Sequence, residues 1–253
     1  MMMEERRRGT EERPTIESDG ARIFLQPIAA PAILGLYALA TASLLIGANY
    51  AGWYGENIGD QVFVLPFAAI FGGLAQLLAG MWAYRARDGL GTAIHAAWGS
   101  FFVAYSLLFL LNAQGTITIP VTGEFTELGW WFVPLGAISL TATLIAYRVN
   151  LALVALLGAL TVSSGLAAGA FFTGEGWALE GAGYAFVISA AAAWYEATGL
   201  MVEPLLGREI PPLFELVRRP SVDTGIGEPG VIKGEFPTLR FSEPVHAERR
   251  MSN

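Results

Sequence analysis

The chain has 253 residues, of which 54% are hydrophobic and 15% are charged, and its mean hydropathy is +0.49. Soluble domains carry about 25% charged residues, so this composition excludes an ordinary water-soluble protein and predicts a membrane protein. The chain has no cysteine, which excludes disulfides, thiolate metal sites and a cysteine nucleophile. The net charge of −7 becomes informative only through the positions of the charges.

Apolar windows of about 20 residues, the length that crosses a hydrocarbon core of roughly 30 Å, recur along the chain. We predict them at about 29–48, 62–84, 92–112, 128–147, 150–172 and 182–203. The windows are continuously apolar, whereas the strands of membrane barrels are short and alternate polar with apolar residues. The predicted fold class is therefore all-α, a polytopic membrane protein with six transmembrane helices joined by short loops.

The two ends of the chain differ from its middle in composition. Residues 1–22 are charged, and residues 218–253 combine prolines and glycines with scattered charges. Such segments bury too little apolar surface to fold alone. We predict a cytoplasmic N-terminal tail over 1–27, a six-helix transmembrane domain over 28–212 and a cytoplasmic, mobile C-terminal tail over 213–253. Whether residues 211–216 form a short segment at the membrane surface stays open.

Positive charges are confined to the two tails and to alternate loops, which all lie on one side of the predicted spans. Arginines precede the first span, Arg85 and Arg87 lie between the second and third, Arg148 lies between the fourth and fifth, and the remaining cations follow the sixth. The loops after the first, third and fifth spans contain acidic residues and no Lys or Arg. The positive-inside rule therefore places both termini in the cytoplasm. We expect the protein to lie in the cytoplasmic (inner) membrane.

Two features of the first and second spans bear on function. Pro27, Pro31 and Gly35 open the first span, and a broken helix entrance leaves backbone N–H groups free to face an anion. A proline in an ordinary first helical turn is the simpler explanation of that segment. In the second span, Gln76 lies on the same or a neighbouring helix face as several glycines. Its amide either bonds to another helix or faces a water-filled path.

Two ionisable residues fall near the cytoplasmic ends of spans. Glu196 lies about two turns inside the sixth span, where insertion scales assign an acid at the helix centre a cost of about 2.5–3.5 kcal/mol. It either snorkels to the interface or carries a proton or a subunit contact. His95, at the start of the third span and near Arg85 and Arg87, is interpreted as an interfacial residue rather than a proton relay.

The chain lacks the residues that several classes of function require. The chain has no Ser/His/Asp set, no facing pair of carboxylates within the spans, no phosphate-binding glycine loop followed by lysine, and no metal-ligand spacing. We therefore expect no enzyme activity, no cofactor and no metal. The charge distribution also excludes a nucleic-acid groove.

Ordered motifs in the spans resemble those of the acetate uptake transporter family, which includes bacterial succinate–acetate permeases and yeast acetate carriers. Residues 31–36 (PAILGL) resemble the family's N-P-x-P-L-G-L signature through Pro31, Leu34, Gly35 and Leu36. Residues 72–80 (GGLAQLLAG) resemble its G-G-x-A-Q-x-x-A-G segment. The likeness continues through residues 84–101 and ends near residue 212, so it covers about residues 28–212 and neither tail.

The resemblance implies a protomer of six helices, assembled into a homo-hexamer, in which each protomer has its own path for small carboxylates such as acetate, and also succinate or lactate. Members are described as anion channels or as proton-coupled symporters. The family's narrow waist is formed by a Phe, a Tyr and a Leu, which fall by position on Leu39, Trp98 and Leu157. Two of these differ from the pattern, and the signature Asn and second Pro become Ala30 and Ile33.

The expected function is therefore transmembrane transport of acetate or another small carboxylate, with Gln76 as a polar pore residue and Glu196 as a possible proton carrier. The alternative is a non-transporting membrane scaffold or sensor that signals through the C-terminal tail. A channel for a neutral or cationic solute would require more polar or acidic pore residues than Glu196 alone supplies.

Overall fold

The computed structural model describes residues 30–55, 58–119, 125–206, 212–214 and 216. Its helices are α1 (Pro31–Tyr50), α2 (Ile58–Phe67), the π-helix η2 (Ala68–Ala75), α3 (Gln76–Arg85), α4 (Gly89–Ala113), α5 (Thr126–Ala146), α6 (Leu151–Thr173) and α7 (Gly176–Leu206). They provide six segments long and apolar enough to cross a membrane, with α2, η2 and α3 joined in one of them. The predicted number and order of spans are confirmed, and residues 1–27 lie outside the described part.

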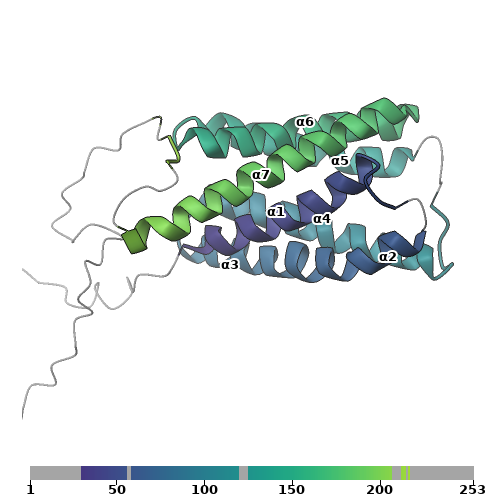
Figure 1. Ribbon diagram of the computed structural model, residues 1–253, viewed down its shortest axis with the longest axis horizontal. Coiled ribbons are helices and arrows are strands. Elements are labelled where there is room, and N and C mark those ends of the chain that lie inside the picture. Colours follow the sequence, from purple (N-terminus) through teal and green to yellow (C-terminus); the bar gives the residue numbers. More distant parts are fainter. Residues whose placement is uncertain (1–29, 56–57, 120–124, 207–211, 215, 217–253) are drawn as a thin grey trace, which may run out of the picture.

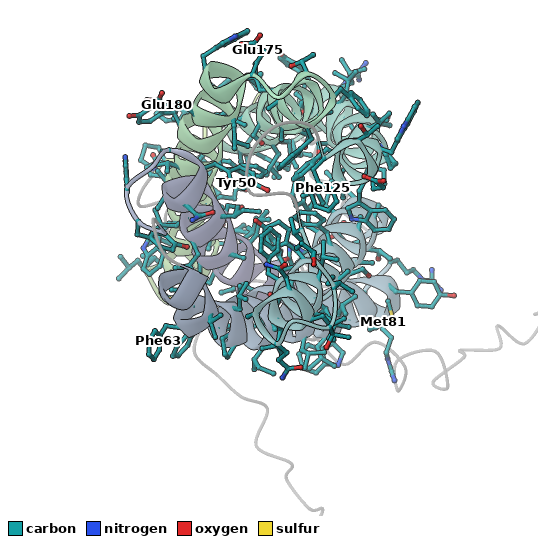
Figure 2. The ribbon with its side chains drawn as sticks, turned by 90° about the vertical axis from the view of Figure 1, so that its right-hand side faces the viewer. Tyr50, Phe63, Met81, Phe125, Glu175 and Glu180 are labelled. Atoms are coloured by element: carbon teal, nitrogen blue, oxygen red, sulfur yellow. The ribbon has the colours of Figure 1, made fainter. Side chains whose placement is uncertain are left out.

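The helices lie side by side along the long axis of the molecule (Figure 1). Neighbouring helices pack in the order α1, α7, α6, α5, α4 and α3 with η2, and α3 and η2 pack again on α1. This order closes a ring. Figure 2 looks onto the end of the ring that the charge distribution assigns to the outside, where Tyr50 lies toward the middle and Glu175 and Glu180 lie on the periphery. The opposite end, where α1, α4 and α6 begin, is the cytoplasmic end.

Glycines allow α1 and α7 to pack closely against each other. A Cβ atom added to Gly183 would collide with the backbone nitrogen of Ala51 and lie 2.7 Å from the carbonyl oxygen of Gly47. A Cβ atom added to Gly47 would lie 2.8 Å from the Cβ of Phe186. Backbone atoms cannot move aside as a flexible side chain can, so this crossing depends on residues without side chains.

The second span contains a π-helical segment that the sequence did not predict. Pro66, inside α2, has no N–H with which to continue the α-helical ladder, and the wider η2 begins two residues later at Ala68. Gly72 and Gly73, both within η2, face α1 and α4, where added Cβ atoms would collide with the Cβ of Ala42 and lie 2.5 Å from Cγ2 of Val103. The π segment thus keeps the second span close to both neighbours.

Residues 212–214, which follow α7, pack against the cytoplasmic end of the bundle. The N–H of Leu151 donates to the carbonyl of Phe214 at 3.1 Å, which satisfies a free donor in the first turn of α6. The Tyr195 hydroxyl donates to the carbonyl of Pro212 at 2.6 Å. Leu213 is buried, and its Cδ2 would lie 2.5 Å from a Cβ on Gly199. The burial of Leu213 and the hydrogen bond to the carbonyl of Phe214 thus hold this stretch against the bundle, while the predicted domain boundaries stay predictions; residues 217–253 lie outside the described part.

Candidate functional site

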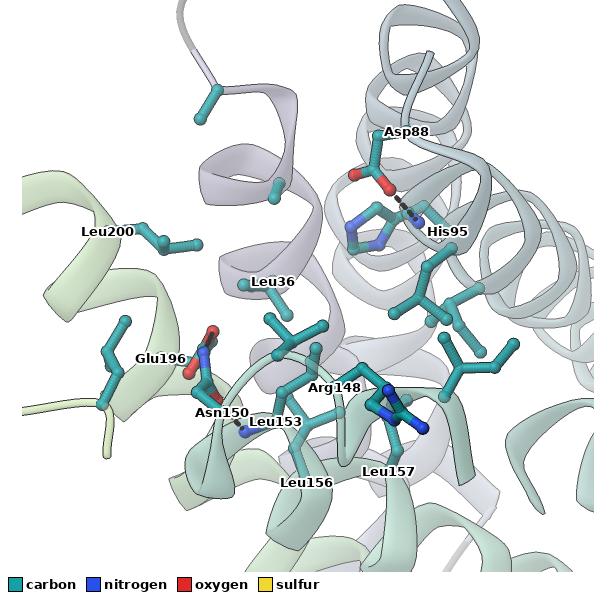
Figure 3. Close-up of a pocket in the computed structure, with 18 of the residues that line it drawn as sticks. Leu36, Asp88, His95, Arg148, Asn150, Leu153, Leu156, Leu157, Glu196 and Leu200 are labelled. Carbon is teal, nitrogen blue, oxygen red and sulfur yellow. Dashed lines mark hydrogen bonds between the residues drawn. The ribbon is translucent and has the colours of Figure 1, made fainter. Parts of the chain in front are cut away.

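A cavity of about 620 Å³ opens at the cytoplasmic end of the ring, between the first turns of α1, α4 and α6 and the last turns of α5 and α7 (Figure 3). We call it the inner vestibule. Leucine side chains form most of its deep wall, among them Leu36, Leu156 and Leu157. Its ionisable and amide side chains are Asp88, His95, Arg148, Asn150, Glu196 and Glu203.

The residues predicted to form the waist are all buried in the hydrophobic core of the bundle. Leu39, Trp98 and Leu157 are at most 1% exposed and belong to the same hydrophobic core. They follow the first residues of α1, α4 and α6 by 8, 9 and 6 positions, which at about 1.5 Å per residue places them roughly 9–14 Å from the cytoplasmic ends of the helices. Leu157 also lines the inner vestibule, so the cavity ends where this cluster begins.

The indole of Trp98 has a fixed partner. Its Nε1–H donates to Oγ of Ser139, on α5, at 3.1 Å, and both residues are buried. The sequence predicted an indole donor in place of the family's phenol, and the structure shows that this donor is already engaged. The face of Trp98 therefore acts as an apolar surface, and Ser139 holds the ring in position.

Aromatic rings fill the space on the outer side of the waist. Trp98 lies edge-on to Phe101, at a centroid distance of 5.5 Å, and to Phe186, at 5.8 Å, and Phe101 lies 5.1 Å from Phe132. These phenylalanines are almost completely buried. A second cavity of about 490 Å³ opens between α4 and α5 toward the outer end and is lined by Phe101 and Tyr105. The two cavities share no lining residue, and a gate formed between them by the waist residues and the rings stays a prediction.

Glu196 is paired at the wall of the inner vestibule. Asn150 donates its Nδ2–H to Oε1 of Glu196 at 2.8 Å, while its own Oδ1 accepts from the N–H of Leu153 at 2.7 Å and so caps α6. The carboxyl is 3% exposed, and its Oε2 has no hydrogen-bond partner among the described residues. This burial does not fit snorkelling to the interface, and the proton-carrying and subunit-contact roles of Glu196 stay predictions.

His95 lies inside the bundle and not at an interface. Its imidazole is 2% exposed, lines the inner vestibule and lies against α1 at Gly35, where a Cβ atom would come within 2.5 Å of Cε1 and Nε2. The prediction of an interfacial histidine is therefore wrong. The sequence could not show which way the side chain points, because that depends on the space left by the missing side chain of Gly35 on α1.

The entrance motif is divided between two surfaces. Gly35 and Leu36 face the interior, and Leu36 lines the inner vestibule. Pro31 and Leu34 instead line an apolar groove on the outside of the ring, beside Tyr37 and Trp194. The α1 N-terminus has no side-chain cap and carries proline in its first turn, which fits both explanations of this segment.

Gln76 is completely buried at the junction of η2 and α3, and neither of its amide atoms has a hydrogen-bond partner among the described residues. A buried amide without a partner is unfavourable, which is compatible with a water or a passing solute reaching it. It lines none of the cavities described above, so its contact with a solute stays a prediction.

Sequence reasoning missed Asn150, Ser139 and the aromatic cluster. Asn150 could have been recognised as an N-cap, since it directly precedes an apolar run. The helical spacing of Trp98, Phe101 and Phe102 also points one aromatic stripe inward. Ser139 left no signal, because a single serine in an apolar span is common.

Comparisons with known proteins agree with this architecture. Residues 14–207 match the GPR1/FUN34/yaaH family. The meiotically up-regulated gene 86 protein of Schizosaccharomyces pombe is 32% identical over 174 residues, which cover 66% of this chain and 56% of that relative. The succinate-acetate/proton symporter SatP of Escherichia coli is 27% identical over 190 residues, which cover 74% of this chain and 96% of SatP.

Among solved structures, the bacterial acetate channel SatP superposes with a TM-score of 0.67 at 25% identity, covering 74% of this chain and 99% of that one. The family match covers most of the chain, and the ring of six apolar spans agrees with it. The chain is therefore a multi-pass membrane protein that belongs to the GPR1/FUN34/yaaH family, as its span motifs indicated.

Proposed function

We propose that this protein transports acetate or a similarly small carboxylate across the membrane, through a path within each protomer. The observation that carries the proposal is the inner vestibule, which ends at Leu157 and the buried waist. The names of two relatives, the succinate-acetate/proton symporter and the bacterial acetate channel, support the choice of substrate.

An apolar waist suits such a substrate. Acetate has a pKa close to that of a glutamic acid side chain, so a fraction of it is protonated near neutral pH. The neutral acid, or a partly dehydrated anion, passes leucine and aromatic surfaces more easily than a strongly hydrated inorganic ion. A narrow apolar segment also closes by expelling water, so small movements of the rings around Trp98 open and close the path.

The test is uptake of labelled acetate into proteoliposomes that contain the purified full-length protein. Saturable uptake well above that of empty liposomes supports the proposal, and its competition by unlabelled succinate and lactate defines the substrate range. Absence of uptake for all three acids would contradict it and favour a scaffold or sensor.

We also propose that Glu196 carries the proton if transport is coupled to a pH gradient. Glu196 lines the vestibule, its buried Oε2 has no hydrogen-bond partner among the described residues, and Asn150 holds the other oxygen. Glu196→Gln keeps an oxygen that can accept from Asn150 but removes the ionisable group. We expect this variant to lose the stimulation by an imposed gradient while keeping uptake down an acetate gradient.

The matched control is Glu203→Gln, which removes an exposed carboxyl from the same cavity. It should respond to the gradient as the wild type does. Equal stimulation of the wild type and Glu196→Gln would remove Glu196 from the coupling mechanism, and no stimulation of the wild type would identify a channel.

The resemblance supports a homo-hexamer as the assembly. Gly165 and Gly169 on α6 face open space, since a Cβ atom on either would meet nothing within 4 Å. A small-residue surface of this kind permits close approach of another helix. Light scattering of the detergent-solubilised protein should give six times the chain mass of 27.0 kDa, and a monomeric mass would exclude the hexamer.

A further inference from the structure

We propose that His95 binds the substrate carboxylate on the cytoplasmic side of the waist. The inference rests on the proposed transport of a small carboxylate and adds a binding residue to that path. His95 precedes Trp98 by three residues on α4, so it lies about one turn, roughly 5 Å, below the waist.

The imidazole is buried but unused by the fold. Its Nδ1 is enclosed without a hydrogen-bond partner, and no described side chain bonds to the ring. Native proteins rarely bury an imidazole with neither nitrogen hydrogen-bonded, and a ligand that bonds to the nitrogen that is not enclosed is one explanation. Because Nδ1 is enclosed, Nε2 is the nitrogen left for a ligand, and a neutral imidazole with its proton on Nε2 donates to a carboxylate oxygen.

Gly35 fixes where that donor lies. The ring occupies the space that a side chain at position 35 would fill, with Cε1, Nε2 and Cδ2 all within 2.6 Å of the added Cβ atom. The imidazole is thus held between α4 and the first turns of α1. A ring held in this way loses little rotational freedom when it binds a ligand. The low entropic cost favours binding even of a substrate that makes few contacts.

The other polar groups of the inner vestibule leave His95 as the donor nearest the waist. Asp88 accepts from the N–H of Gly91 at 2.8 Å and caps α4. Glu196, on α7, is an acceptor that is already bonded to Asn150. Asn150 precedes the waist residue Leu157 of α6 by seven positions, so this pair lies farther from the waist than His95 does. Arg148 is exposed in the turn that follows α5 (Figure 3). A carboxylate that leaves Arg148 therefore meets its next side-chain donor at His95.

The surface around His95 also fits the other half of a short carboxylic acid. Leu36, Ile94 and Leu157 line the vestibule with His95 and offer apolar contact to a methyl group. An amphipathic site of this kind binds the carboxylate by one hydrogen bond and the alkyl end by burial. It should therefore prefer acetate over chloride, which has no apolar part, and over acetamide, which has no charge.

Nuclear magnetic resonance can observe this contact directly, because His95 and His246 are the chain's two histidines. Full-length protein labelled with ¹⁵N-histidine is reconstituted in liposomes, and the signals of His95 are identified by their loss in His95→Gln. We expect acetate to shift the ring nitrogens of His95 in a saturable way, with no such shift from chloride or acetamide. Unchanged His95 signals at acetate concentrations that saturate uptake would overturn the proposal.

Uptake kinetics provide the second measurement. His95→Leu removes the donor and should raise the acetate concentration for half-maximal uptake by about tenfold, the effect of losing one hydrogen bond to a charged group. His95→Gln keeps a donor and should recover part of that loss. Ser100→Ala, an exposed position on the same helix, is the control and should match the wild type.

The outcomes separate the two proposals. If the wild type takes up no acetate, the proposed function fails. If it takes up acetate but the His95 signals do not move, or His95→Leu keeps the half-maximal concentration of the wild type, only the role of His95 is wrong.

Discussion

Replacing Leu157 by tryptophan is expected to reduce acetate uptake by about tenfold or more, because an indole there closes a passage that is already narrow. The leucine is buried at the bottom of the inner vestibule, where the cavity ends at the waist. The larger ring has room on the vestibule side, so it can be accommodated without disrupting the bundle. The measurement is the initial rate of labelled acetate uptake at matched protein density.

The control for this variant is Leu140→Trp, which places the same ring on the outward face of α5, where Leu140 is 49% exposed and lies away from the small-residue surface of α6. Its uptake should stay close to that of the wild type. An unchanged rate in Leu157→Trp, with a normal size-exclusion profile, would show that the substrate does not pass Leu157.

Gly183→Ala is expected to cause the largest loss of stability among single-methyl additions in the bundle. The added Cβ would collide with the backbone of Ala51 and crowd Gly47, so α1 and α7 must separate. Overpacking of this kind costs about 1–3 kcal/mol. Thermal unfolding of the protein in detergent should show a lower midpoint, and the loss of α1 contacts should also reduce uptake.

The comparison that isolates this effect is Gly181→Ala, two residues earlier on α7. Its added Cβ would meet only Cδ1 of Leu166, at an ordinary 3.4 Å. Alanine is the better helix former by about 1 kcal/mol, so this variant should be as stable as the wild type or slightly more stable. Equal stabilities of the two variants would mean that α1 and α7 do not cross at Gly183.

The spans could be predicted from the sequence, because length and apolar composition determine a membrane helix almost without tertiary information. The predicted first span, 29–48, became α1 at Pro31–Tyr50, and the predicted fifth, 150–172, became α6 at Leu151–Thr173. The π segment escaped prediction, because Pro66 permits a kink, a bulge or a break, and packing against α1 and α4 decides among them.

The site was predictable only in part. The family motifs pointed to Leu39, Trp98 and Leu157, and the structure buries all three in the hydrophobic core. The polar contacts depend on residues far apart in sequence, such as Asn150 with Glu196, 46 positions away, and Trp98 with Ser139, 41 positions away. No local pattern encodes such pairs.

Gly35 illustrates the same limit. In the sequence, it belongs to a helix entrance with Pro31; in the structure, it provides the space for His95. The burial of that histidine follows from the absence of a side chain on another helix, which no periodicity within α4 reveals.

The central claim is that substrate passes from the inner vestibule through the waist, and the absence of native cysteine allows it to be tested with Leu153→Cys. The protein is reconstituted with its cytoplasmic side outward and treated with a negatively charged, membrane-impermeant methanethiosulfonate. We expect modification at position 153 to block acetate uptake, whereas modification of Tyr84→Cys, exposed near the end of α3 and remote from the vestibule lining, should leave it unchanged. Full uptake by completely modified Leu153→Cys would contradict the account and place the path elsewhere.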